Sequence, residues 1–244
     1  MASHDITFPC STGRPMRAAI AAPGGGKALP GVIVIHEVFG LNHDIRRITA
    51  RLSNLGYVTL APDLYDRGLI RPICIAQTML ELHRGNGRAL EDLEAAYRFL
   101  ADQPSVDSSR IGVIGFCMGG GFALLYAVRA PLCVVAPFYG DVPKSADKLR
   151  GVCPVLGSYG GRDRIFASQG ERLEKLLSEL GIEHDVKIYP QAGHSFMSDN
   201  LGILATVGKF SPMKAGYNQA AAEDAWKRIE SFFARHLKSA NPQP

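Results

Sequence analysis

Short apolar runs alternate with amphipathic stretches along the chain from residue 30 onward. The apolar runs predict strands at Val32–Ile35, Tyr57–Ala61, Ile111–Phe116, Leu132–Phe138, Pro154–Tyr159 and Val186–Tyr189. The first run consists of four β-branched residues, which is typical of a strand buried on both faces. A sheet that contains such a strand must be covered on both sides.

Between the strands, apolar residues recur three and four positions apart, which is the spacing of one helical face. Helices are predicted around Ile45–Leu55, Leu90–Leu100, Gly119–Arg129, Leu173–Leu180 and Ala222–Phe233. Gly56 closes the first helix, and Ser168 with Glu171 forms a capping box that opens the fourth. Strands that alternate with helices imply βαβ crossovers. We therefore expect an α/β fold with a mostly parallel central sheet and helices on both faces.

Two segments interrupt this rhythm. An irregular insert at about 64–88 has no clean helical or strand period, and an irregular segment at about 201–218 carries three glycines and a proline. Long irregular segments in a compact domain are usually functional loops or lids, and surface decoration is the alternative. Neither a repeat nor a linker divides the chain, so residues 1–244 are interpreted as a single domain.

Composition narrows the class of protein. Hydrophobic residues make up 46% and charged residues 20% of the 244 residues, as in ordinary globular proteins. No run of about 18 apolar residues is present and the first residues do not resemble a secretory signal, so we expect no membrane partner. The net charge of +4 comes from scattered basic residues, which predicts no nucleic-acid partner.

The cysteines indicate the compartment. Five cysteines are widely spaced and include no Cys-x-x-Cys pair, so neither a disulfide framework nor a zinc knuckle fits them. They are interpreted as free thiols of a cytoplasmic protein. Because the histidines also lack metal-ligand spacing, we expect no metal and no organic cofactor.

The strongest chemical motif is Gly115-Phe116-Cys117-Met118-Gly119, at the junction of a predicted strand and a predicted helix. A Gly-x-Ser-x-Gly sequence at such a junction forms a nucleophile elbow, and here Cys117 replaces the serine. Glycines are needed because side chains beside the nucleophile would clash with the adjacent strand and helix. The residues that follow fit neither a Walker loop nor a dinucleotide fingerprint, so the motif predicts a cysteine nucleophile.

A cysteine nucleophile needs a base and an orienting acid. In hydrolases with such an elbow, the acid and then the histidine follow the nucleophile along the chain. Asp163 follows the Pro154–Tyr159 strand and His194 follows the Val186–Tyr189 strand, so both should reach the edge of the sheet where Cys117 lies. Asp141, after the preceding strand, is the alternative acid.

Four motifs together resemble the dienelactone hydrolase family: His36-Glu37-Val38-Phe39-Gly40, Ala61-Pro62-Asp63-Leu64-Tyr65, Gly115-Phe116-Cys117-Met118-Gly119-Gly120 and Gly193-His194-Ser195-Phe196. The resemblance spans about residues 5–237 and implies an α/β-hydrolase fold. It implies a catalytic triad of Cys117, Asp163 and His194. It also implies that Glu37 contacts the resting cysteine, and that the backbone N–H groups of Val38 and Met118 form the oxyanion hole.

Within that family, the dienelactone enzyme itself has an arginine four residues after the triad histidine, where it holds the substrate carboxylate. This chain has Ser198 there, and Arg67, Arg71 or Arg84 in the irregular insert could replace the arginine. His36, beside the expected oxyanion hole, either shapes the site or is a buried structural histidine.

The expected function is hydrolysis of a carboxylic ester or lactone through a thioester intermediate. The expected partner is a small-molecule substrate, and the protein should be a monomer or a small homo-oligomer. Two alternatives belong to other classes: a redox-sensitive thiol protein that uses Cys117, and a non-catalytic ligand-binding relative.

Overall fold

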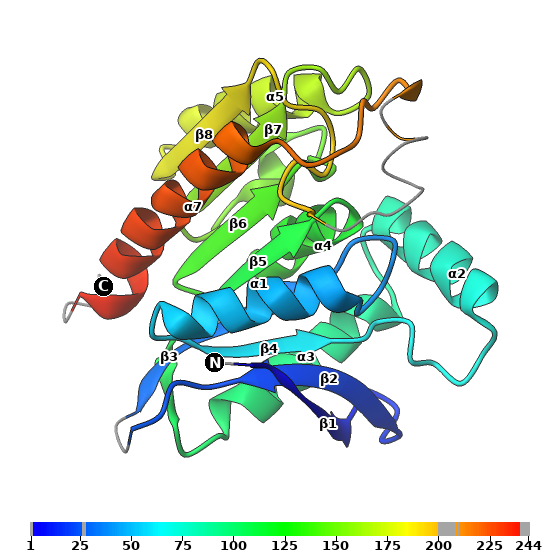
Figure 1. The fold of residues 1–244 in the computed structure, drawn as a ribbon, viewed down its shortest axis with the longest axis vertical. Helices are drawn as coiled ribbons and strands as arrows, with labels where there is room; N and C mark the ends of the chain where they lie inside the picture. The colour runs from blue at the N-terminus through cyan, green and yellow to red at the C-terminus, as the bar shows by residue number, and fades with distance from the viewer. Residues whose placement is uncertain (1, 26–27, 200–207, 209, 240–244) are drawn as a thin grey trace.

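The computed structural model describes residues 2–25, 28–199, 208 and 210–239, and they form a layered α/β structure (Figure 1). Its sheet has eight strands in the order β1-β2-β4-β3-β5-β6-β7-β8. The strands are β1 (His4–Pro9), β2 (Pro15–Ala21), β3 (Leu29–Ile35), β4 (Val58–Pro62), β5 (Val106–Phe116), β6 (Val134–Phe138), β7 (Val155–Gly160) and β8 (His184–Tyr189). Strands β3 to β8 are mutually parallel, as the sequence predicts.

An antiparallel hairpin, which the sequence pattern did not reveal, extends the sheet at one edge. Strand β1 pairs with β2, and β2 pairs antiparallel with β4. Five of the six residues of β1 are at least partly exposed. A strand of this kind lacks the continuous apolar run that identifies the central strands, so its own sequence does not reveal it.

Helices cover both faces of the sheet. They are α1 (His43–Asn54), α2 (Arg71–Arg84), α3 (Arg88–Ala101), α4 (Met118–Ala127), α5 (Ala167–Glu179) and α7 (Gln219–Phe233), with short turns at Ala146–Leu149 and Ala234–Lys238. Helices α1 and α7 lie in front of the sheet in the view of Figure 1, and α3, α4 and α5 lie behind it. Each layer has its own apolar core: Ile48 and Trp226 belong to the front core, and Leu93 and Phe122 to the rear core.

Two local expectations are wrong. The insert at about 64–88 is not irregular throughout, because residues 71–84 form helix α2. Only Cys74 and Thr78 of this helix are fully buried, while Ile73 and Leu80 are exposed, so its apolar residues do not lie on one face and give no clear period. In the other segment, 201–218, residues 201–207 and 209 lie outside the described residues, and 211–218 form no helix or strand.

The predicted capping box at Ser168 is the second error. Helix α5 begins at Ala167, so Ser168 lies inside its first turn and caps nothing. The N–H groups of Ile165 and Phe166, just before the helix, instead donate to the Asp163 carboxylate. These charge-assisted hydrogen bonds hold the turn around Asp163, and the chain is already helical when it reaches Ser168.

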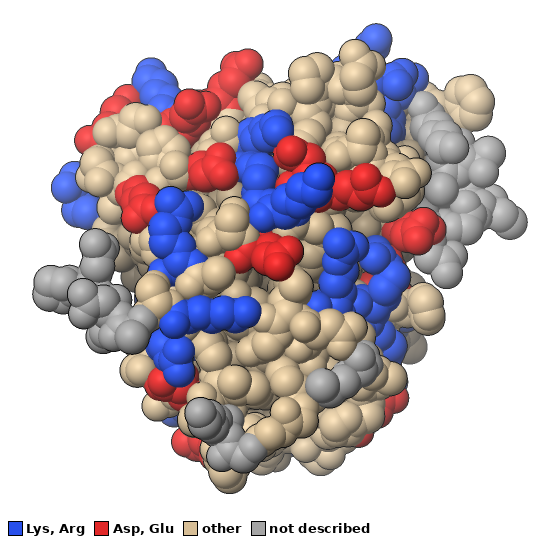
Figure 2. Space-filling model, turned by 60° about the vertical axis from the view of Figure 1, so that its left-hand side comes forward, with Lys and Arg blue, Asp and Glu red and all other residues tan. Residues whose placement is uncertain are grey.

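The surface carries interspersed charges. On the face shown in Figure 2, basic and acidic side chains alternate without a large field of one sign. Several of the charges are paired, among them Lys187 with Asp224 and Arg228 with Asp185. None of the described helices is both long and apolar enough to cross a membrane.

Candidate active site

Cys117 lies in the sharp turn between β5 and α4. Its backbone has φ 54° and ψ −119°, a left-handed conformation that is unusual for a residue other than glycine. The Cys117 N–H donates to the Phe138 carbonyl of the neighbouring strand at 3.0 Å, which holds the turn against the sheet. The side chain is partly exposed at the carboxyl edge of the parallel strands.

The two glycines of the elbow are required by close backbone packing. A Cβ on Gly115 would lie 2.0 Å from the Gly119 carbonyl oxygen. A Cβ on Gly119 would lie 2.4 Å from the Ile35 carbonyl oxygen on β3. Neither approach is possible for a larger residue, so the steric reason given for this motif at the sequence level is confirmed.

The structure joins the predicted acid and base. Nδ1 of His194 lies 2.6 Å from Oδ2 of Asp163, and both residues are almost completely buried. The turn that carries Asp163 also contacts the histidine loop, because the Arg162 N–H donates to the Ala192 carbonyl at 2.9 Å. No described residue forms a hydrogen bond with the buried Nε2 of His194.

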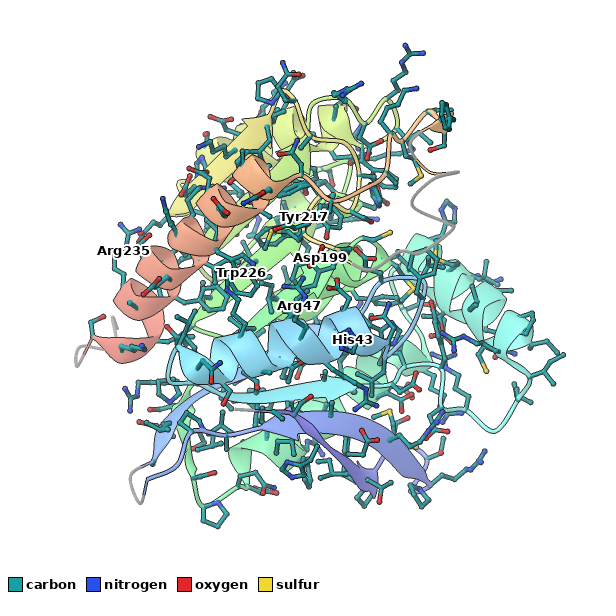
Figure 3. The ribbon with its side chains drawn as sticks, viewed as in Figure 1. His43, Arg47, Asp199, Tyr217, Trp226 and Arg235 are labelled. Atoms are coloured by element: carbon teal, nitrogen blue, oxygen red, sulfur yellow. The ribbon has the colours of Figure 1, made fainter. Side chains whose placement is uncertain are left out.

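The position of His194 is fixed from several sides. Its backbone N–H donates to the Met213 carbonyl at 2.9 Å, and its backbone carbonyl accepts from the Gly216 N–H at 3.0 Å. Farther along the loop, Arg47 of α1 donates to the Met197 carbonyl. Figure 3 shows Arg47 close to the loop that includes Asp199. The histidine is therefore held by the later part of the chain as well as by α1.

The environment of His194 favours its cationic form. Burial by itself lowers the pKa of His194, but the hydrogen bond to Asp163 and the negative charge of Cys117 and Asp163 outweigh burial and raise that pKa to about 10. The Cys117 side chain is thus close enough to His194 to interact with it. At neutral pH the imidazole carries a proton that it can give away.

The two predicted oxyanion amides have no competing partner. Neither the Val38 N–H nor the Met118 N–H donates to another described residue. Val38 follows the end of β3, and Met118 is the first residue of α4, where the helix dipole adds positive potential. Both amides therefore remain available to a negatively charged oxygen near Cys117.

The carboxylate of Glu37 is bound by two hydroxyl groups. Its Oε1 accepts hydrogen bonds from the Tyr139 hydroxyl at 3.1 Å and from the Ser198 hydroxyl at 2.9 Å. Among the described residues, no hydrogen bond joins Glu37 to Cys117, and the contact implied by the family resemblance stays a prediction. Burial raises the pKa of Glu37, and the hydrogen bond from Ser198 and the charge of His194 oppose part of this shift.

The arginines of the insert have different surroundings. Arg67 is buried and forms a two-pronged ion pair with Glu81 at 2.7 and 2.9 Å, so it is not available to a substrate. Arg71 is exposed and donates to the Phe39 carbonyl, next to Val38. Arg84 is exposed at the far end of α2.

The alternative acid lies elsewhere. Asp141 is exposed and lines a surface cavity with Leu82 and Lys144. Among the described residues, no hydrogen bond or ion pair joins Asp141 to His194, whose hydrogen-bonded acid is Asp163.

Sequence reasoning missed two aromatic side chains that enclose the histidine. The rings of Tyr139 and Phe166 lie 5.0 and 4.9 Å from the His194 ring, measured between centroids. Tyr139 directly follows β6, and its place at the carboxyl end of a strand was the one available signal. Its φ of 41° and its hydrogen bond to Glu37 depend on tertiary structure.

No group of three or more His, Cys, Asp or Glu side chains in the described part of the chain could hold a metal ion.

The sheet order, the sharp turn at Cys117 and the likeness to solved structures define the class of protein: this is an α/β-hydrolase fold. Within that class, residues 16–237 match the dienelactone hydrolase family, and the chain belongs to this family.

The curated relatives have consistent names. A protein of Yersinia pestis named "Putative carboxymethylenebutenolidase" is 32% identical, with 98% of this chain and 91% of the relative covered. A Saccharolobus solfataricus protein of the same name is 31% identical, with 95% of this chain and 98% of the relative covered. The chain is therefore a hydrolase of the dienelactone hydrolase family.

Solved structures agree with this assignment. The crystal structure of a "Putative Dienelactone Hydrolase" from Klebsiella pneumoniae has a TM-score of 0.78 at 27% identity, over 96% of this chain and 98% of that one. The "Dienelactone Hydrolase-like Promiscuous Phospotriesterase P91" from metagenomic libraries has a TM-score of 0.83 at 24% identity, over 97% of this chain and 100% of that one. The latter likeness concerns the fold.

Proposed function

We propose that this hydrolase cleaves carboxylic esters or lactones through a thioester on Cys117, with His194 as acid and base and Asp163 as the orienting group. One observation carries the proposal. One nitrogen of His194 is hydrogen-bonded to Asp163 at 2.6 Å, while the other has no hydrogen-bond partner among the described residues and Cys117 lies close to the ring.

Acylation uses the protonated histidine. The Cys117 thiolate attacks the carbonyl carbon and forms a carbon–sulfur bond, while the carbonyl oxygen becomes an oxyanion held by the Val38 and Met118 N–H groups. The carbon–oxygen bond of the ester then breaks, and His194 gives its proton to the departing alkoxide. A lactone opens in the same way, and its alcohol remains attached to the acyl group.

Deacylation needs the histidine in its neutral form. Once the sulfur is part of a thioester, it no longer carries the negative charge that helps to raise the pKa of His194. The neutral ring can then take a proton from water, and the hydroxide formed attacks the thioester carbonyl. The carbon–sulfur bond breaks, the carboxylic acid leaves, and Cys117 and His194 return to the ion pair.

Asp163 selects the required tautomer of His194. Its carboxylate accepts the proton on Nδ1, so in neutral His194 Nε2 is free to accept a proton. It also stabilises the imidazolium of the resting enzyme, which deacylation forms again. A cytoplasmic location fits the free cysteines of the described residues, because thiols stay reduced there.

Hydrolysis of p-nitrophenyl acetate by wild type and variants tests this proposal. We expect Cys117→Ala to lose several orders of magnitude in kcat while it keeps its melting temperature, and Cys117→Ser to lose most of its rate because an alcohol is harder to deprotonate. Cys133→Ala is the matched control, because Cys133 is partly buried and lies outside the site. An acetyl group should be found on Cys117 by mass spectrometry after rapid acid quenching.

Two outcomes would contradict the proposal. Full esterase activity in Cys117→Ala would show that Cys117 is not the nucleophile. If ester turnover is absent from the wild type while peroxide oxidises Cys117 rapidly and reversibly, the redox-sensitive alternative would replace it.

A further inference from the structure

His36 is completely buried, and both of its ring nitrogens have partners. Nε2 lies 3.1 Å from the Leu64 nitrogen, and Nδ1 lies 2.7 Å from the Glu37 carbonyl oxygen. A backbone N–H can only donate, so Nε2 must be the acceptor. The proton is therefore on Nδ1, which donates to the Glu37 carbonyl, and the ring is neutral.

This carbonyl belongs to the same peptide group as the Val38 N–H. The peptide is planar and trans, so its C=O and N–H point in opposite directions. The Glu37 carbonyl accepts one hydrogen bond from His36 and a second from the Gly40 N–H at 2.9 Å. Two donors that fix the carbonyl also fix the direction of the Val38 N–H.

The second oxyanion amide is fixed in a similar way. The Cys117 carbonyl accepts from the Gly120 N–H at 2.9 Å and the Gly121 N–H at 3.4 Å, and the opposite end of that peptide is the Met118 N–H. Helix α4 supplies both of these donors as part of its regular structure. Val38 lies in a turn, where no helix is present, and the side chain of His36 supplies one of the two donors.

We propose that His36 is a positioning residue for the oxyanion hole: its Nδ1–H tautomer holds the Glu37–Val38 peptide so that the Val38 N–H faces the substrate oxygen. The inference rests on the proposed ester hydrolysis. It assigns a role to a histidine that touches neither substrate nor nucleophile.

The surroundings of His36 keep the ring neutral. Burial lowers the pKa of His36, and the positive charge of Arg71 acts in the same direction, while Asp63 and the Glu37 carbonyl oppose them. Oδ1 of Asp63 lies 3.8 Å from Nε2, and the ring of Tyr65 packs against the imidazole at 4.8 Å. Protonation of Nε2 would place two N–H groups against each other at Leu64.

Two amide variants separate the two hydrogen bonds of His36. In His36→Asn, the side-chain NH₂ lies near the place of Nδ1 and can still donate to the Glu37 carbonyl, but the acceptor for Leu64 is lost. In His36→Gln, the longer side chain reaches the Leu64 N–H with its oxygen, but the side-chain donor to the Glu37 carbonyl is lost and only the Gly40 N–H still donates to it. Both variants remove the ring, so their losses of packing are similar.

We expect kcat for p-nitrophenyl acetate to fall about 100-fold in His36→Gln, with KM within about 3-fold, because a misdirected amide acts only on the transition state. His36→Asn should stay within about 5-fold of the wild-type kcat. Alkylation of Cys117 by iodoacetamide, which develops no oxyanion, should proceed equally fast in all three proteins. Melting curves verify that each variant is folded.

Equal losses of kcat in the two variants would overturn the proposal, and so would a slower alkylation in His36→Gln that matches its loss of kcat. If the variants do not fold, ¹⁵N NMR of wild-type His36 remains decisive. We expect the Nδ1–H tautomer without titration between pH 6 and pH 9, and an Nε2–H tautomer would refute the assignment. Failure of the proposed function itself would appear separately, as esterase activity in Cys117→Ala.

Discussion

Replacing Asp163 by asparagine should lower the rate of hydrolysis strongly while it changes the stability of the protein little. Oδ1 of Asp163 accepts from the N–H groups of Ile165 and Phe166 at 3.0 and 3.1 Å, and Oδ2 faces His194. In Asp163→Asn the amide oxygen can keep the first two hydrogen bonds, while the NH₂ group takes the place of Oδ2. A donor then faces Nδ1 of His194, and the neutral ring must carry its proton on Nε2.

The cost can be estimated from this geometry. With the proton on Nε2, the neutral ring cannot take a proton from water, and the cation has lost its carboxylate. The corresponding change in a serine triad lowers kcat by about 10⁴, which is about 5 kcal/mol in the barrier. Because a thiol needs less help than an alcohol to attack, deacylation should bear the larger part of the loss. We therefore expect a fast burst of p-nitrophenol, a steady rate lower by about 10³ to 10⁴, and an acyl group that accumulates on Cys117.

Three variants make the test complete. Asp163→Ala removes all three hydrogen bonds, and the two partly buried backbone N–H groups that it leaves unpaired should cost about 2 kcal/mol in the free energy of unfolding. Asp163→Asn should be nearly as stable as wild type in urea, and Asp141→Asn should keep the wild-type rate within about 2-fold, as expected for a surface substitution. Wild-type turnover in Asp163→Asn, or a larger loss in Asp141→Asn, would refute the reasoning.

Three further predictions follow from contacts and pKa shifts in the site. kcat/KM should be constant through neutral pH and fall as His194 loses its proton near pH 10. In Asp163→Asn the fall should begin at lower pH, because the carboxylate that raises the pKa of His194 is gone. An unchanged alkaline limb in this variant would contradict the pairing of Asp163 with protonated His194. Gly119→Ala should lower the urea midpoint by the equivalent of about 3 kcal/mol because its Cβ meets the Ile35 carbonyl, whereas the control Gly24→Ala, with nothing within 4 Å, should not. Because burial raises the pKa of Glu37, its carboxylate lowers stability as the pH rises above the ordinary carboxyl range, so Glu37→Gln should raise the melting temperature at pH 8 more than at pH 5. An equal or lower melting temperature at pH 8 would show that the charge of Glu37 is fully compensated.

The sequence predicted those parts of the molecule in which local pattern and tertiary structure agree. The strands β3, β4, β6 and β7 and the second half of β5 are buried on both faces, and their apolar runs make them recognisable in the sequence. The order of Cys117, Asp163 and His194 along the chain, each after a parallel strand, placed three side chains at one edge of the sheet. Gly115 and Gly119 were also predictable, because the backbone around the elbow leaves no space for a side chain at either position.

Other features depend on contacts that no local pattern contains. Glu37 is separated from Tyr139 and Ser198 by 102 and 161 positions, and only the finished sheet brings them together. The family resemblance implies a contact between Glu37 and Cys117, but it gave no sign that the hydroxyls of Tyr139 and Ser198 donate to the Glu37 carboxylate. Helix α2 was hidden because its apolar side chains are largely exposed, Ile70 just before it being 67% accessible.

The support of His194 by later residues determines the order in which the working site is assembled. During synthesis, β5 and the elbow emerge first, then the Asp163 turn, then the histidine. Even then His194 has no fixed place, because the Met213 carbonyl and the Gly216 N–H that hold its backbone have not yet been made. Under the proposed function, a nascent chain that already contains Cys117 and most of the sheet should therefore be inactive. We expect activity to arise only after residues 213–216 have been synthesised and have bound the backbone of His194.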